Sequence, residues 1–203
     1  PVRGEPRDAL VGSTLADLPT GALVATGSVR RRAQLAWLRP DLTFTGLRGN
    51  IATRLAKAGD YAAIVMAAAA LERLGLADRA TEVLDPDVML PQVGQGALAI
   101  EARAGDAPVL NALTAIEHGP SRVAVEAERG FLAELGGDCD LPAGAHATVA
   151  PDGSVALEGL LASLDGHVVL RESDTGPAAG AAAVGHALAR RLLDDHGGAA
   201  LLT

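Results

Sequence analysis

Short apolar runs alternate with helix-like patterns through the first part of the chain. These runs predict buried strands at residues 22–26, 42–47 and 61–66. Ser28 and Asn50 are placed as N-caps of helices that fill the two gaps, and an Ala-rich helix ending near Gly75 follows the third run. Strands and helices that alternate at this spacing predict a parallel α/β lobe, whose ligands bind at the carboxyl ends of the strands.

The remainder of the chain has a different pattern. Turn residues separate three further apolar runs, and a closing helix follows them. The predicted strands lie at 97–102, 145–149, 154–163 and 166–172, and the predicted helices at 108–116, 121–135 and 177–195. The strand at 97–102 has no partner nearby in sequence, whereas the last three form a small sheet with a covering helix. The fold class is therefore α/β plus α+β, and residues 1–8 are predicted to be a charged loop.

The composition argues against nucleic-acid binding, membrane association and metal binding. The formal net charge is −8, and only 2% of the residues are aromatic. General nucleic-acid binders need a basic surface, often with aromatic stacking platforms, so no nucleic-acid partner is expected. No apolar run reaches the roughly 20 residues of a membrane span, and no signal peptide is evident, so a cytoplasmic protein without a membrane partner is expected. No Cys/His group has metal-ligand spacing, so no metal is expected.

Arginine is distributed unevenly. Only one of the 17 basic residues is lysine, Lys57. Nine arginines lie in the first 75 residues, and six of them, most near predicted turns, form one candidate set: Arg30, Arg31, Arg32, Arg48, Arg54 and Arg73. A guanidinium fork binds carboxylates in a bidentate manner, and helix N-termini add free N–H groups, so this set predicts a site for a small multi-anionic ligand. The alternative is that residues 30–32 form a solvated helix face.

The single cysteine, Cys139, lies in a Gly-rich loop between Asp138 and Asp140. A lone cysteine is most often a small buried hydrophobe. The flanking carboxylates disfavour the thiolate, which makes a nucleophile that turns over in every cycle a poor fit. A cysteine alkylated once, as a permanent tether, tolerates a slow thiolate.

Five segments together resemble the porphobilinogen deaminase family. They are TGSVRR at 26–31, LRGNIATRL at 47–55, LERLG at 71–75, LPQVGQGA at 90–97 and GDCDLP at 137–142. Their order and approximate spacing match the family across essentially the whole chain. The resemblance implies a periplasmic-binding-protein-like lobe that precedes a small C-terminal domain.

The resemblance also implies an activity. The family joins four porphobilinogen units head to tail into hydroxymethylbilane, with loss of ammonia, in haem biosynthesis. Its dipyrromethane cofactor is attached through a thioether, which the resemblance places at Cys139. The positions implied to contact cofactor or substrate carboxylates are Thr26, Ser28, Arg30, Arg31, Arg48, Asn50, Arg54 and Arg73.

The chain departs from the family at several places. Asp138 replaces the usual Gly before the cysteine, and Ala52 and Ala70 stand where Gly is common. The family's N-terminal segment, with its Ser-Met-Lys-Asp-Val-Pro stretch and catalytic Asp, is absent, and the chain opens without Met. We therefore expect a C-terminal portion of the protein with no catalytic residue of its own and no activity alone.

The expected division is domain 2 at 1–91, a segment returning to domain 1 at 92–118, and a C-terminal domain at 119–203. The full-length protein is expected to be a monomer. The alternative function is a non-catalytic, anion-binding lobe of the periplasmic-binding type, in which Cys139 is structural.

Overall fold

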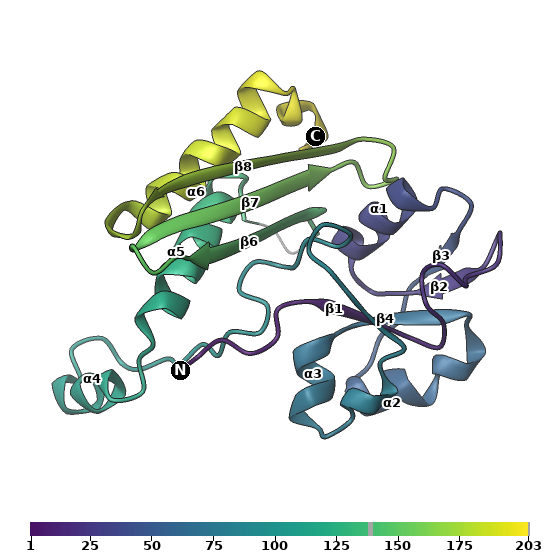
Figure 1. Ribbon diagram of the computed structural model, residues 1–203, viewed down its shortest axis with the longest axis horizontal. Helices are drawn as coiled ribbons and strands as arrows, with labels where there is room; N and C mark the ends of the chain where they lie inside the picture. Colours follow the sequence, from purple (N-terminus) through teal and green to yellow (C-terminus); the bar gives the residue numbers. More distant parts are fainter. Residues whose placement is uncertain (138–139, 203) are drawn as a thin grey trace.

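The computed structural model describes residues 1–137 and 140–202, which form two sheets with their helices (Figure 1). The first sheet has five short strands, and the second has three longer ones. The predicted α/β lobe followed by a three-stranded sheet is confirmed.

The first sheet has the strand order β3-β2-β4-β1-β5. Its strands are β1 (Asp8–Val11), β2 (Leu23–Ala25), β3 (Thr43–Thr45), β4 (Ala63–Ala67) and β5 (Glu82–Leu84). β2 pairs in parallel with β3 and β4, as predicted, but β1 pairs antiparallel with both β4 and β5. The sheet is therefore mixed, because the three predicted strands pair in parallel and β1, which was not predicted, runs antiparallel to its two neighbours. The prediction that residues 1–8 form only a loop is wrong at its last residue.

β4 shows why this sheet is buried on both faces. Ile64 and Met66 pack into the core on one face, and Ala63 and Val65 into the core on the other. Successive strand residues point to opposite faces, so a continuous apolar run is what a strand between two helical layers requires. The helices of this lobe are α1 (Val29–Leu38), α2 (Ile51–Ala56) and α3 (Ala68–Arg73), with short 3-10 turns at Ala58–Asp60 and Ala77–Arg79.

The segment after this lobe does not form the predicted strand. Residues 93–96 make a turn, but residues 97–103 have no regular structure. A strand needs a neighbour to satisfy its backbone groups, and none of the described strands pairs with this segment, so the prediction of a strand at 97–102 is wrong. Helix α4 (Ala107–Thr114) follows as predicted, and it projects from the molecule with no buried residue (Figure 1).

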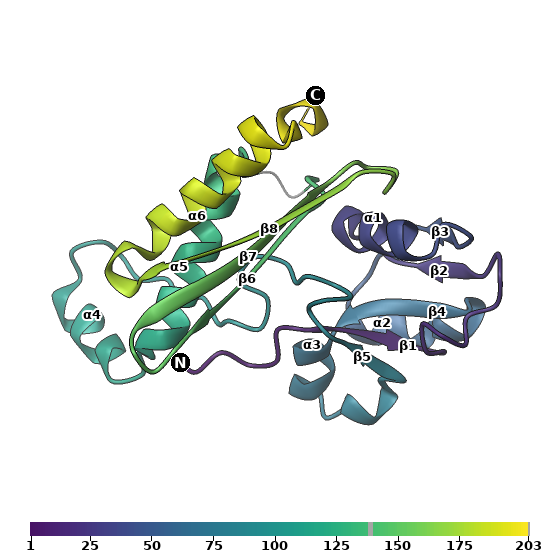
Figure 2. The same cartoon turned by 45° about the horizontal axis from the view of Figure 1, so that its top comes forward.

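The second sheet is antiparallel with the order β6-β7-β8. It consists of β6 (Ala143–Val149), β7 (Ser154–Ala162) and β8 (Val169–Pro177). Helices α5 (Gly119–Glu134) and α6 (Ala181–Arg190) lie side by side on one face of it, and Arg191–Asp195 continues α6 as a π-helix before a last 3-10 turn at Gly198–Leu201 (Figure 2). β8 and the 3-10 turn Ala178–Gly180 occupy the predicted start of the closing helix.

Two glycines let α5 and α6 approach closely. A Cβ on Gly185 would lie 2.1 Å from the carbonyl oxygen of Ala127, and one on Gly130 would lie 2.2 Å from that of Ala182. Both contacts are with backbone atoms, which cannot move aside as a flexible side chain can. Glycine at these two positions therefore sets the distance between the helices.

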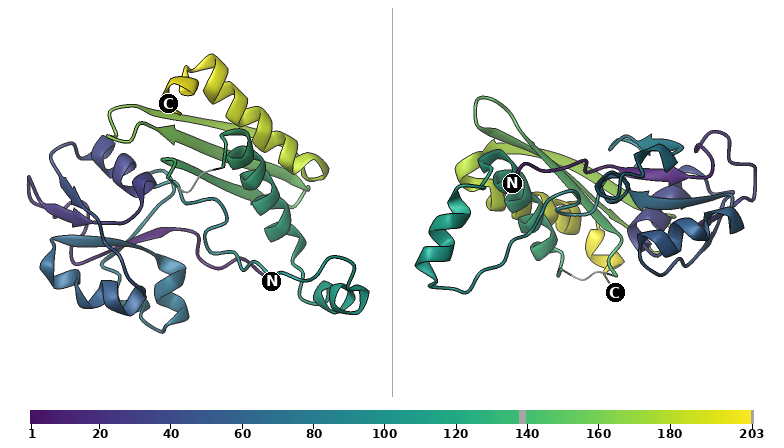
Figure 3. Two further views of the ribbon diagram at one scale, coloured as in Figure 1. Left: turned by 180° about the vertical axis from the view of Figure 1, so that it is seen from behind. Right: turned by 90° about the horizontal axis from the view of Figure 1, so that it is seen from below.

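The two units meet at α1 and at the N-terminal segment. A small apolar cluster of Ala33, Leu90, Leu160 and Ala162 joins α1 to β7. Residues 1–7 run from α5 to the first sheet, which both views of Figure 3 show, and the backbone N–H of Arg3 donates to Ser121 Oγ at 2.9 Å. The first residues of the chain therefore bridge the two units.

Candidate anion-binding site

A cavity of about 190 Å³ lies where β2 and β3 end and α1 begins. The side of β2 contributes residues 26–29 together with Arg32, and the side of β3 contributes residues 44–46 and Arg48. The cavity lies at the carboxyl ends of the parallel strands, where ligands bind in sheets of this kind. The structure thus brings Thr26, Ser28 and Arg48, three of the predicted site residues, into one lining.

Side-chain caps shape the turns around this cavity. Ser28 Oγ accepts from the backbone N–H of Arg31, and the Ser28 N–H donates to Thr26 Oγ1 at 3.2 Å. Asn50 Oδ1 accepts from the Thr53 N–H at 2.9 Å and begins α2. Both N-caps were predicted, and both are confirmed. The N–H groups left free at the first turn of α1 favour a negatively charged ligand.

Five arginines of the first lobe form no ion pair with any described residue: Arg32, Arg48, Arg54, Arg73 and Arg79. Arg54 Nε donates to the Gly49 carbonyl at 2.8 Å, and Arg73 Nη2 donates to the Gly96 carbonyl at 3.2 Å. Neither of these two lines the cavity. Arg48 is exposed and makes no hydrogen bond within the described part of the chain. Its guanidinium is therefore available to a ligand.

Arg30 and Arg31 have a different environment. Both are buried and share the carboxylate of Asp8, with Arg30 Nη2 at 2.8 Å from Oδ2 and Arg31 Nη2 at 2.7 Å from Oδ1. Arg30 is 1% exposed, and its Nη1 donates to the Leu90 carbonyl at 2.5 Å. Burial alone would raise the pKa of Asp8, but the two guanidinium groups outweigh it and hold that pKa below its usual value. In this structure the pair faces Asp8 and not the cavity.

A second buried carboxylate, Glu128, lies in α5. It is fully buried and binds Arg3 Nη1 at 2.6 Å, and it accepts from the backbone N–H groups of Gly94 at 2.6 Å and Ala147 at 2.8 Å. Burial alone would raise the pKa of Glu128, but nearby His146, the Arg3 guanidinium and the backbone donors lower it. Glu128 therefore ties the N-terminal segment to the second sheet.

Gln95 connects the two buried carboxylates. Its backbone carbonyl oxygen accepts from Arg3 Nε at 2.9 Å, and its side-chain Nε2 donates to Asp8 Oδ1 at 3.0 Å. Sequence reasoning missed Asp8, Gln95 and Glu128. For Asp8 the sequence did carry a signal, because an acidic residue stands directly before an apolar run in a lobe that also contains two adjacent arginines.

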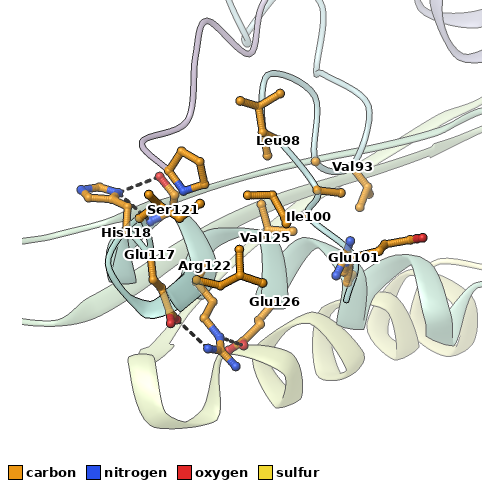
Figure 4. A pocket seen from close by; sticks show the side chains of 17 residues that line it. Val93, Leu98, Ile100, Glu101, Glu117, His118, Ser121, Arg122, Val125 and Glu126 are labelled. Atoms are coloured by element: carbon orange, nitrogen blue, oxygen red, sulfur yellow. Dashed lines mark hydrogen bonds and ion pairs between the residues drawn. The ribbon is translucent and has the colours of Figure 1, made fainter. Parts of the chain in front are cut away.

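A larger cavity, about 650 Å³, lies elsewhere, between residues 97–101 and the first half of α5 (Figure 4). Leu98 and Ile100 are about half exposed along it. Its Arg122 is paired with Glu117 at 2.5 Å and with Glu126 at 2.8 Å, as the dashed lines in Figure 4 show. Arg129 also lines this cavity, but Glu101, Glu117 and Glu126 line it too, so its described acidic residues outnumber its arginines. The cavity at the ends of β2 and β3 is therefore the better anion site.

Cys139 lies outside the described residues. Within the described part of the chain, no group of three or more His, Cys, Asp or Glu side chains is placed to hold a metal ion. No described helix is long and apolar enough to cross a membrane.

Two family models match the chain. Residues 1–111 match "Porphobilinogen deaminase, dipyromethane cofactor binding domain", and residues 123–194 match "Porphobilinogen deaminase, C-terminal domain".

Several curated proteins are similar along nearly the whole chain. The porphobilinogen deaminase of Roseiflexus castenholzii is 52% identical over 207 residues, which cover 100% of this chain and 67% of the relative. That of Nitratidesulfovibrio vulgaris (strain Miyazaki F) is 49% identical over 98% of this chain and 65% of the relative. That of Chromobacterium violaceum is 48% identical over 95% and 63%. The chain thus spans about two thirds of the length of these relatives.

Proposed function

The chain belongs to the porphobilinogen deaminase family, and from this premise we propose that it is the cofactor-carrying part of an enzyme that joins four porphobilinogen units into hydroxymethylbilane with release of ammonia. The observation that carries the proposal is the cavity at the ends of β2 and β3, lined by two arginines that pair with no described carboxylate. Each pyrrole of cofactor and substrate bears carboxylates, which such guanidinium groups bind in bidentate fashion.

The proposed site residues fall into three groups: those that line the cavity, those on neighbouring turns and a buried pair. Arg48 and the hydroxyls of Thr26 and Ser28 line the cavity and bind carboxylates directly. Asn50, Arg54 and Arg73 extend this surface along the neighbouring turns. Arg30 and Arg31 contribute indirectly. Their guanidinium groups donate to the carboxylate of Asp8, and these bonds fix the start of α1.

The dipyrromethane cofactor belongs to the domain that residues 1–111 match, and the residues present suit its carboxylates. We place its covalent attachment at Cys139, through a thioether, from the GDCDLP match alone. When bound, the cofactor supplies the end to which pyrrole units are added. The division into 1–91, 92–118 and 119–203 is part of the same proposal, and within it Arg3 of the first segment contacts α5 of the last one.

Proton transfer is assigned to a residue outside these 203. The chain contains no Ser-Met-Lys-Asp-Val-Pro stretch, and the buried carboxylates Asp8 and Glu128 are both held as anions by arginine. Removing a general acid or base lowers rates by about 10²–10⁴-fold, and loss of substrate positioning adds to this. The chain alone is therefore expected to make no detectable hydroxymethylbilane. The family also favours a cytoplasmic monomer with no nucleic-acid partner.

The test is Arg48→Leu in the full-length protein. We expect cofactor assembly or chain elongation to stall, with apparent affinity for porphobilinogen falling about tenfold or more, because a charge-assisted contact is lost. Arg79→Leu is the matched control, because Arg79 is also exposed and lies outside the cavity. Equal kinetics and equal adduct masses in the two variants would return Arg48 to the solvated surface. A full-length wild type that binds anions but neither consumes porphobilinogen nor carries an adduct would favour the non-catalytic alternative.

A further inference from the structure

The cavity at the ends of β2 and β3 has a second arginine that the family resemblance did not assign. Among the residues that the structure describes, Arg32 and Arg48 are the only charged side chains in its lining, and no acidic side chain lines it. Neither arginine forms an ion pair with the residues that the structure describes. In a chain of net charge −8, two unneutralised arginines on one small cavity indicate a ligand with its own negative charge.

Arg32 is also held from the other unit of the molecule. Its Nη2 donates to the carbonyl oxygen of Leu164 at 2.9 Å, in the turn between β7 and β8. This turn packs against α1 at Gly166, where an added Cβ would lie 2.5 Å from the carbonyl oxygen of Ala33 and 2.7 Å from the Cβ of Ala36. The 163–168 turn therefore fixes one N–H of the Arg32 guanidinium.

We propose that Arg32 is a further carboxylate-binding residue of this cavity, oriented by the 163–168 turn of the C-terminal unit. The inference rests on the proposed function and extends it. A guanidinium has five N–H donors, and the bond to Leu164 uses one of them, so the others are free for a carboxylate. Arg32 lies on α1 and Arg48 on the turn after β3, so the two approach the cavity from different elements.

The ligand carboxylate has two possible sources, the incoming pyrrole or the bound cofactor, and two measurements on the full-length protein separate them. For Arg32→Gln we expect either a rise of about tenfold in the KM for porphobilinogen or a fall in the fraction of protein that carries the cofactor mass. The first result assigns Arg32 to the substrate, and the second assigns it to the cofactor. Arg79→Gln makes the same charge change at an exposed site outside the cavity and should alter neither measurement.

The same measurements separate an error in the assignment of Arg32 from an error in the proposed function. If the wild-type protein neither consumes porphobilinogen nor carries the cofactor, the proposed function is wrong. If the wild type does both, Arg48→Leu impairs them and Arg32→Gln matches Arg79→Gln, then the assignment of Arg32 alone is wrong.

The orienting role of the turn has its own test. Gly166→Ala should move the turn away from α1 and weaken the same step as Arg32→Gln, although Arg32 is still present. Gly153→Ala is the control, because Gly153 has a similar positive φ of 81° in the other hairpin turn but no atom within 4 Å of an added Cβ. Equal kinetics in the two glycine variants, with both folded by circular dichroism, would overturn the role of the turn.

Discussion

Asp8 is the residue whose loss should most disturb the first lobe. Its carboxylate is fully buried and accepts from Arg30, Arg31 and Gln95 at 2.7–3.0 Å. Asp8→Asn keeps the shape of the side chain but removes the negative charge, so two buried guanidinium groups lose their counter-charge. Removing one partner of a buried ion pair costs about 3–5 kcal/mol.

Unfolding experiments can measure this loss directly. For a chain of about this length each kcal/mol lowers the melting temperature by roughly 2–4 °C, so we expect a fall of about 6–20 °C. Trp37 is the only tryptophan and lies on α1, the helix that carries Arg30 and Arg31. Its fluorescence reports on this lobe, while far-ultraviolet circular dichroism reports on the whole chain.

A matched variant makes the result decisive. Asp41→Asn removes a carboxylate from the same lobe that pairs with Arg39 at 2.7 Å near the surface. Pairs of this kind are screened by water and contribute little. If Asp8→Asn destabilises the protein no more than Asp41→Asn, the assignment of Asp8 as the buried counter-ion of α1 is refuted.

Two further predictions concern the second unit. Because the folded-state pKa of Glu128 is lowered, its stabilising contribution is complete above its unfolded-state pKa of about 4.3 and is lost as the pH falls toward the folded-state value. Glu128→Gln should therefore flatten the acid limb of the stability profile in urea titrations, and an unchanged limb would contradict this. Gly185→Ala should cost at least about 1–3 kcal/mol by overpacking α5 against α6. Gly180→Ala, whose Cβ would meet its nearest atom at 4.0 Å, should be close to neutral in the same thermal melts.

Local signals in the sequence predicted the elements that local chemistry determines. Ser28 and Asn50 cap the helices they were expected to cap, since an N-cap bond spans only three residues. The turns at Gly153 and Gly166 likewise separate the three strands of the second sheet. These turns and caps depend on neighbours in the sequence and need no knowledge of the fold.

Long-range pairing accounts for what was missed. β1 has four residues, and its place between β4 and β5 depends on partners more than 50 positions away. Because β1 was not expected, the burial of Arg30 and Arg31 against Asp8 could not be foreseen. The apolar composition of 97–102 suggested a strand, but composition does not supply the neighbouring strand that its backbone requires.

The intact mass of the active, full-length protein shows whether a cofactor is attached to it. We expect a mass that exceeds the sequence mass by two linked pyrroles, and a Cys139→Ser variant that has the sequence mass and no activity. A purified protein that makes hydroxymethylbilane at the unmodified sequence mass would contradict a covalent cofactor on Cys139.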